Sequence, residues 1–174
     1  MEDFNKAVEL DPEDAITYNN MGLAQKKLDD MDGSLASFTN SIELDPEYVP
    51  PYFNRANVFI SKRQYDRALK DLDTVLGLDP EYVYAYQTRG FVLFQEKRFV
   101  EAIRDYSKMI ELTPENPIGW KNRGVIRQKN GDLKGAVSDL RKSLDVAAPN
   151  WHNRRAVESL LEKLQEALRK KNEE

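Results

Sequence analysis

The sequence predicts an all-α protein built from helical repeats, and three observations lead to this fold class. Prolines recur at intervals of 34 residues, at Pro12, Pro46, Pro80 and Pro114. An aromatic column and a small-residue column repeat with the same interval: Tyr18, Tyr52, Tyr86 and Trp120, and Gly22, Ala56, Gly90 and Gly124. Between the prolines, large apolar residues are spaced by three, four and seven, which is the period of a helix and not the alternation of a strand. A fixed period of this length is typical of an array of helix pairs.

Each repeat is predicted to hold two helices that end at a recurring Leu-Asp-Pro sequence, which becomes Leu-Thr-Pro at 112–114. Proline interrupts a helix because it lacks an amide hydrogen and its ring clashes with the preceding turn. We expect first helices at 15–28, 49–62, 83–96 and 117–130, and second helices at 31–44, 65–78, 99–112 and 133–146. Small residues such as Gly22 and Ser34 should let the two helix axes of a pair approach closely.

The N-terminal stretch 2–10 aligns with a second helix alone, because Phe4 precedes Phe38 by 34 residues. We favour the interpretation that this half repeat was cut from a longer array. Alternatively, the helix caps the array by itself, or the flank of Phe4 and Val8 pairs with another molecule. Self-association through this unpaired helix is therefore one expectation.

The periodic columns stop after Pro149, and residues 151–172 are expected to form a capping helix. Its apolar stripe consists of Val157, Leu160, Leu161, Leu164 and Leu168. The stripe should cover the last repeat, while Arg169, Lys170 and Lys171 complement the dipole at the end of the helix. A coiled-coil or membrane-surface role is the less favoured alternative, because the stripe is short.

The whole chain, residues 1–174, is expected to form a single domain. It would contain a half repeat at 2–10, four repeats at 15–48, 49–82, 83–116 and 117–150, and the capping helix at 151–172. A chain of this length buries about two thirds of the surface that its unfolded form exposes, so a second globular domain is not expected.

The order of aromatic, small, apolar, alanine, aromatic and proline positions resembles the tetratricopeptide repeat (TPR) family over about residues 2–146. The departures are mild: Ser34 stands where alanine is usual, and Gln25 and Arg127 stand where tyrosine or leucine is common. The resemblance implies a right-handed α-solenoid of antiparallel helix pairs, a TPR-like superhelix. It also implies that the first helices line a concave groove, which is the usual ligand-binding surface of the family.

An arginine column and an aspartate column change together between repeats. Each arginine is followed 16 residues later by an aspartate, in the pairs Arg55 and Asp71, Arg89 and Asp105, and Arg123 and Asp139. The first repeat has Met21 and Ser37 at these positions. An unpaired charge between packed helices is costly, so we expect each arginine to bind its aspartate. An arginine row that binds acidic ligand groups is the weaker alternative.

Composition argues against several classes of function. The 26 basic and 30 acidic residues give a formal charge of −4, which disfavours nucleic-acid binding. With no cysteine and one histidine, His152, the chain has neither thiolate zinc sites nor multi-histidine metal clusters. We find no apolar run that could span a membrane, no signal peptide, no catalytic constellation and no cofactor motif. We therefore expect no enzyme activity, metal or cofactor.

A polar column on the first helices is one candidate for ligand binding, at Asn20, Asn54, Thr88 and Asn122. An amide both donates and accepts hydrogen bonds, so such a row could satisfy the backbone of an extended peptide without reading its side chains. A similar asparagine ladder is used by superhelical TPR domains such as that of the protein O-linked N-acetylglucosamine transferase. Hydrogen bonding between repeats is an equally favoured alternative.

The other columns of the candidate groove are apolar in the middle and polar at the flanks. They add Asn57, Gln87 and Lys121, and an apolar patch formed by Phe53, Ile60, Tyr84, Phe91 and Phe94. Helix 83–96 is apolar nearly all round and therefore needs cover on both sides. We expect the patch to receive apolar side chains of a partner peptide or amphipathic helix. Burial by neighbouring repeats is the alternative.

Some TPR proteins hold the terminal carboxylate of heat-shock chaperones with lysine, arginine and asparagine side chains. That set is not reproduced here. Asn54 matches the middle position, but Asn19 and Leu23 replace a lysine and an asparagine, and Tyr84 and Thr88 replace a basic pair. A carboxylate clamp is therefore disfavoured, although Lys121 and Lys129 could attract an acidic ligand end.

We therefore expect a non-catalytic protein-interaction scaffold that binds a peptide or helix of a partner protein in its concave groove. The alternatives are a targeting or accessory TPR domain cut from a longer enzyme, and a self-associating scaffold. Neither nucleic acid nor membrane is an expected partner. The absence of cysteine does not fix the compartment, and a soluble, cytoplasmic protein is the expectation.

Overall fold

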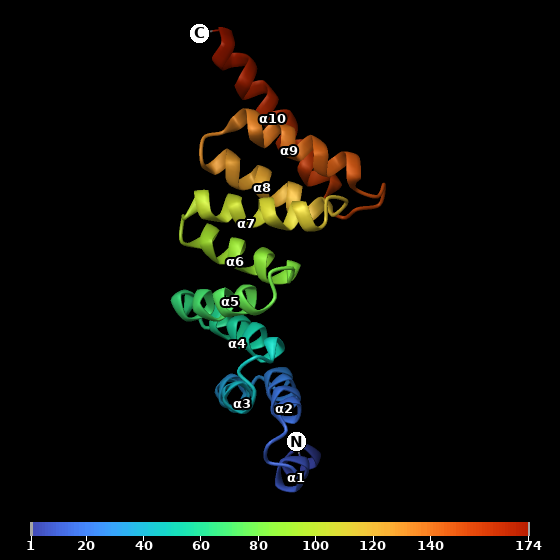
Figure 1. Cartoon of the computed structure of the whole chain (residues 1–174). Helices are drawn as coiled ribbons and strands as arrows, with labels where there is room; N and C mark the ends of the chain where they lie inside the picture. The colour runs from blue at the N-terminus through green and yellow to red at the C-terminus, as the bar shows by residue number, and fades with distance from the viewer. Residues whose placement is uncertain (1, 174) are drawn as a thin grey trace. The chain divides into compact units, whose positions relative to one another are not determined.

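The computed structural model describes residues 2–173, and within them it contains ten α-helices and no strand (Figure 1). The chain starts with α1 (Glu2–Leu10). Its first helices are α2 (Ala15–Lys27), α4 (Val49–Ser61), α6 (Val83–Gln95) and α8 (Pro117–Lys129). Its second helices are α3 (Met31–Leu44), α5 (Tyr65–Leu78), α7 (Phe99–Leu112) and α9 (Leu133–Val146), and α10 (Arg154–Glu173) follows. The all-α class and the alternation of helices are confirmed, and the first helices end one residue before their predicted ends.

Side-chain caps and left-handed residues set the helix ends. Asp14, Asp30 and Asp132 each accept a backbone hydrogen bond at the start of the following helix, at 2.8–2.9 Å. The turn between the helices of each pair contains one residue with positive φ: Asp29 (63°), Arg63 (56°), Lys97 (59°) and Gly131 (85°). A left-handed residue ends a helix and reverses the chain within a few residues.

The capping helix begins at Arg154, so the prediction that it starts at residue 151 was wrong. Residues 151–153 instead form a turn, in which the Arg154 amide donates to the Trp151 carbonyl oxygen at 3.0 Å. The Arg154 guanidinium donates to the carbonyl oxygens of Leu144 and Ala147 at 3.0 and 2.9 Å. This side chain therefore satisfies backbone acceptors at the end of α9, where a cation is also favoured by the helix dipole.

Glycines in the small-residue column allow aromatic rings to pack directly on a helix backbone. A Cβ atom added to Gly22 would lie 2.6 Å from the Phe38 ring, and one added to Gly90 would lie 2.8 Å from the Tyr106 ring. Both distances are shorter than van der Waals contact. The predicted role of small residues, to let paired helices approach, is therefore confirmed in these two pairs.

The chain divides into two compact units, and the boundary falls between Ala85 and Tyr86, inside α6. In the N-terminal unit, α1 packs on α2, α3 packs on α2 and α4, and α4 packs on α5. In the C-terminal unit, α8 packs on α7 and α9, and α9 packs on α10. The expectation of a single domain over residues 1–174, with its division into repeats, stays a prediction.

The two terminal helices differ in how well their apolar faces are covered. Val157 and Leu164 of α10 are buried with Val137 and Leu140 of α9, which confirms the capping role of α10. In α1, Phe4 and Val8 are half-buried. Self-association through α1 stays a prediction. None of the described helices is both long enough and apolar enough to cross a membrane.

Candidate peptide-binding sites

All three predicted arginine–aspartate pairs are present, and each is bidentate. The guanidinium Nε and Nη2 atoms donate to the two carboxylate oxygens at 2.7–2.9 Å in Arg55–Asp71, Arg89–Asp105 and Arg123–Asp139. The three carboxylates are buried. Because these arginines are bound inside the helix pairs, they do not form the ligand-binding row that was the weaker alternative.

Arg55 and Arg123 also reach the helix before their own pair. Arg55 Nη1 donates to Thr39 Oγ1 of α3 at 3.0 Å, and Arg123 Nη1 donates to Ser107 Oγ of α7 at 2.9 Å. Each guanidinium therefore joins three helices of two consecutive repeats.

Gln25 and Arg127 belong to the same polar contacts between paired helices as the arginine–aspartate pairs, and neither was predicted there. In the first repeat, Ser37 Oγ donates to Gln25 Oε1 at 2.6 Å, so the counterpart of the arginine–aspartate pair includes Gln25 and not Met21. In the fourth repeat, Arg127 Nη1 donates to Asp139 at 2.9 Å. Gln25 and Arg127 occupy one repeat column, in which tyrosine or leucine is common. Their polar side chains were the sequence signal for these contacts.

The asparagines of the predicted amide column lie in different environments. Asn54 donates to Asn19 Oδ1 at 2.9 Å, which joins α4 to α2. Asn20 is exposed. Asn122 hydrogen-bonds the Tyr106 hydroxyl, and this hydroxyl donates to the Gln87 carbonyl oxygen at 3.2 Å. The bonds of Asn54 and Asn122 favour the alternative that amides in this column connect neighbouring helices.

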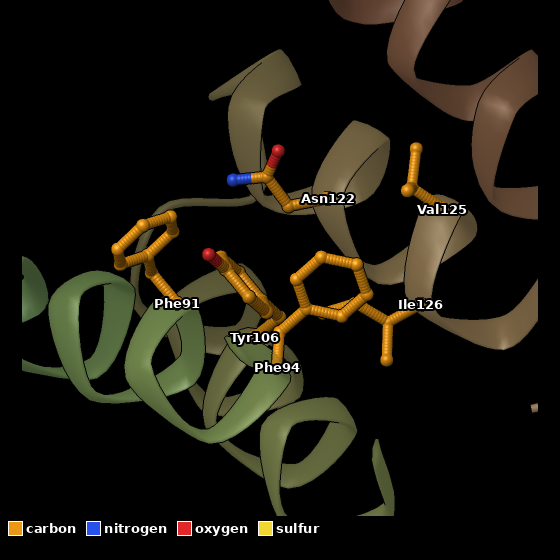
Figure 2. Close-up of a pocket in the computed structure, with 6 residues that line it drawn as sticks. All are labelled: Phe91, Phe94, Tyr106, Asn122, Val125 and Ile126. Atoms are coloured by element: carbon orange, nitrogen blue, oxygen red, sulfur yellow. The ribbon is translucent and has the colours of Figure 1, made fainter. Parts of the chain in front are cut away.

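A cavity of about 140 Å³ opens in the C-terminal unit among α6, α7 and α8, and we call it the α6–α8 cavity. It is lined by Phe91, Phe94, Tyr106, Asn122, Val125 and Ile126. Figure 2 shows the Tyr106 hydroxyl pointing toward Asn122, with the Phe91 and Phe94 rings on either side of the Tyr106 ring. Apolar cavities of about 150 Å³ admit a molecule as large as benzene. The α6–α8 cavity is therefore large enough for one apolar side chain.

Burial shifts the pKa of Tyr106 in the cavity wall and of Lys121, which lies on α8 one turn before the lining residue Val125. Burial raises the pKa of Tyr106 to about 12, against a smaller lowering by the Asn122 hydrogen bond, so the phenol stays neutral at ordinary pH. Burial also lowers the pKa of Lys121, whose side chain is half-buried. Lys121 precedes Val125 by one turn of α8. Within residues 2–173, no carboxylate forms an ion pair with this lysine.

The N-terminal unit carries an aromatic cluster formed by Phe53, Tyr82 and Tyr84. The Phe53 and Tyr82 ring centroids are 5.1 Å apart, and those of Tyr82 and Tyr84 are 6.3 Å apart. Tyr84 is 66% exposed, whereas Phe53 is half-buried. Tyr82 was not predicted as a site residue, because it lies before the predicted helix. Its signal was Tyr48, one repeat earlier.

The remaining predicted residues lie near these two sites or within their helices. Asn57 donates to the Phe53 carbonyl oxygen at 2.9 Å, and Ile60 is half-buried on the same helix. Gln87 contributes its carbonyl oxygen to the Tyr106 hydroxyl. The structure thus brings together Phe91, Phe94 and Asn122, and in the other unit it brings Tyr82 between Phe53 and Tyr84.

Comparisons with known proteins agree with this helical architecture. Tetratricopeptide repeat models match residues 15–48 and 53–117, and the first interval coincides with the first predicted repeat. The chain belongs to the tetratricopeptide repeat family. No curated protein matches the sequence.

Solved structures confirm the fold class of the TPR chain. A crystal structure of MamA has a TM-score of 0.78 at 20% identity, over 82% of this chain and 84% of MamA. Cut9 in the Cut9–Hcn1 hetero-tetramer of the APC/C has a TM-score of 0.72 at 20% identity, over 95% of this chain and 32% of that chain. The first TPR of Spaghetti (RPAP3), bound to the HSP90 peptide SRMEEVD, has a TM-score of 0.64 at 25% identity, over 67% of this chain and 93% of that one. The fold is thus an α-solenoid of helix pairs.

Proposed function

We propose that this TPR protein is a non-catalytic interaction scaffold that holds a partner protein by accepting a bulky apolar side chain in the α6–α8 cavity. The observation that carries the proposal is the cavity itself, because it is open, mostly apolar and lined by two partly accessible phenylalanines. Phe91 is 43% exposed. Exposed rings around a cavity are typical of the anchor points of protein interfaces.

The chemistry of the cavity favours an apolar anchor over a polar one. Tyr106 and Asn122 hydrogen-bond each other, and the Tyr106 hydroxyl also donates to the Gln87 carbonyl oxygen. A polar ligand group would have to compete with these bonds, whereas an apolar group only displaces water. Full burial of a leucine or phenylalanine side chain supplies about 1.5–3 kcal/mol.

Lys121 indicates a second chemical feature of the partner, in addition to its apolar anchor. It is a half-buried cation one turn from Val125, which lines the cavity. Burial removes part of the water that stabilises the Lys121 ammonium group. A carboxylate of the partner beside it would compensate for this loss. We therefore infer that the partner segment carries an acidic residue close to its apolar anchor.

The other predicted groove residues extend this proposal along the first helices. Phe53 and Tyr84, with Tyr82, would form a second anchor site in the N-terminal unit. Asn20, Asn57 and Ile60 would contact a segment bound in the N-terminal unit, and Gln87 would contact the segment bound at the α6–α8 cavity. In support, the similar TPR of RPAP3 was solved with a bound peptide.

The test is affinity capture with the wild-type chain, followed by titration of the captured protein's binding segment. Wild type is compared with Phe91→Ser/Phe94→Ser, and with Val125→Trp, which narrows the cavity without removing a lining ring. Both variants should weaken binding by tenfold or more while far-UV circular dichroism remains unchanged. Val100→Ser is the matched control, because it removes an exposed apolar side chain of α7 that does not line the cavity. Unchanged binding by both cavity variants would contradict the proposal.

A further inference from the structure

The last helix pair carries a second groove, between α9 and α10, which shares no lining residue with the α6–α8 cavity. It consists of two adjoining hollows of about 340 and 410 Å³, and Leu168 of α10 lines both. The beginning of α9 lies beside the end of α10, because Leu133 and Lys134 line the same hollow as Leu168 and Lys171. Leu133, Val137 and Leu168 give this α9–α10 groove apolar walls.

Four cations surround the α9–α10 groove: Lys134 and Arg141 on α9, and Arg169 and Lys171 on α10. All four side chains are exposed, and in the described part of the chain Lys134, Arg141 and Lys171 form no ion pair, whereas Arg169 interacts with the Glu166 carboxylate, which is paired with Lys170. The one lining carboxylate, Asp132, accepts the Gly135 amide hydrogen bond at 2.8 Å and lies 3.7 Å from Arg127. In a chain of net charge −4, this groove is a local concentration of positive charge.

Helix stability explains only part of this charge. Arg169 and Lys171 lie near the end of α10, where cations are favoured by the helix dipole. Lys134 is the second residue of α9, where the exposed amide groups make a cation unfavourable. Arg141 lies in the middle of the same helix, where the dipole gives it no advantage. The helix dipole therefore does not account for these two side chains, which are free to meet a ligand of opposite charge.

We propose that the α9–α10 groove binds an acidic, amphipathic helical segment of a partner protein. Lys134 and Arg141 are seven residues apart, which is about 10 Å along a helix axis. Carboxylates seven residues apart on the bound helix would match this separation, while an apolar side chain between them would contact Leu168 and Val137. A nucleic acid would meet the cations but would gain nothing from the apolar walls, and the negative charge of the whole chain would repel its phosphates.

The probe for this site is a synthetic helical peptide with glutamates at seven-residue spacing and leucines between them. It is titrated into the full-length, 15N-labelled chain while amide chemical shifts are recorded. The shift changes should concentrate in α9 and α10. Affinity should fall at least tenfold in Lys134→Glu/Arg141→Glu, and it should weaken between about 50 and 300 mM salt because screening shortens the range of charge interactions.

A matched control separates local recognition from general attraction. Arg155→Glu/Lys163→Glu introduces the same change in charge on exposed residues of α10 that do not line the groove, and it should keep the affinity within about twofold. The Phe91→Ser/Phe94→Ser variant should also bind normally, so failure at the α6–α8 cavity and failure here are distinguishable. The proposal is overturned by an absence of shifts at millimolar peptide or by equal losses in both charge variants. Tighter binding of oligothymidylate or of phosphatidylserine vesicles would overturn it as well.

Discussion

At the scale of single residues, the buried arginine–aspartate pairs are the polar contacts on which the helix pairs depend. The Asp71 carboxylate accepts two hydrogen bonds from Arg55, at 2.9 and 2.8 Å. We predict that Asp71→Ala lowers the unfolding free energy by about 3 kcal/mol, because a partly buried guanidinium is left without its carboxylate. Replacing both residues by leucine should cost clearly less. Urea denaturation measures both effects.

An exposed ion pair in the same unit supplies the control for this comparison. Lys62 Nζ lies 2.8 Å from Asp32, whose side chain is 87% exposed. Asp32→Ala should leave the unfolding free energy almost unchanged, because water screens the pair and replaces its contact. If Asp71→Ala and the double leucine variant lowered the unfolding free energy equally, the prediction would be contradicted, because packing alone would then explain the loss of stability.

Tyr106 should make the protein less stable at alkaline pH. Burial holds its pKa at about 12 in the folded chain, whereas an unfolded tyrosine loses its proton near pH 10. Above pH 10 the unfolded state therefore binds fewer protons than the folded state, and stability falls as the pH rises toward 12. We predict that Tyr106→Phe flattens this decline by about 1 kcal/mol between pH 10 and 11. Urea denaturation at pH 8, 10 and 11 measures the slope, and equal slopes for both proteins would contradict the prediction.

The sequence contains enough information for some of these contacts and not for others. The arginine–aspartate pairs could be predicted because both members change together from repeat to repeat. The bond between Asn54 and Asn19 could not, because asparagine recurs at Asn20 and Asn122 without the same partner. The contact of Tyr106 with Asn122 also escaped prediction, because Phe38 and Leu72 in the same column have no hydroxyl group.

At the scale of helices, close approach depends on which residue faces the glycine column. A Cβ atom on Gly22 would lie 2.6 Å from an aromatic carbon of Phe38, whereas one on Gly124 would lie 3.1 Å from Leu140 Cγ. We predict that Gly22→Ala costs about 1–3 kcal/mol, since the ring must move and the two helices must separate.

The fourth repeat supplies the matched control for that substitution. Gly124→Ala should be nearly neutral, because alanine favours a helix by about 1 kcal/mol over glycine and offsets the tighter contact. The second repeat already carries alanine and leucine in these columns, at Ala56 and Leu72, and both are buried. Thermal unfolding of the two variants makes the comparison. A greater loss from Gly124→Ala than from Gly22→Ala would show that contact with the ring does not set the cost.

The bounds of the repeat helices could be predicted from the sequence more accurately than the start of the capping helix α10. Within the repeats, proline and apolar spacing act at the same points in every unit, and aspartates cap α2, α3 and α9, so many boundaries are indicated more than once. Residues 147–153 belong to no repeat, and their course depends on the contact of Arg154 with the end of α9. A tertiary contact of this kind leaves no periodic trace.

At the scale of the whole molecule, a small number of recurring columns is sufficient to specify the fold. MamA shares 20% of its residues with this chain in the aligned region, yet the TM-score is 0.78. Most residues can therefore differ while the helical repeat fold is kept. This explains why the repeat architecture could be predicted from the sequence alone. The α6–α8 cavity could not, since it depends on how individual side chains fill the space between helices.

The guanidinium groups that join three helices have a consequence for how such a chain can change in length. Arg55 reaches Thr39, and Arg123 reaches Ser107, each 16 residues earlier, so the hydroxyl group occupies a fixed place in the unit before the arginine. If a gene gained one extra copy of a complete unit, the arginine of each inserted or displaced unit would still meet an acceptor at that place. Growth by duplication of whole units would therefore keep this contact between neighbouring units, while the carboxylate that balances each buried charge lies within the same unit as its arginine.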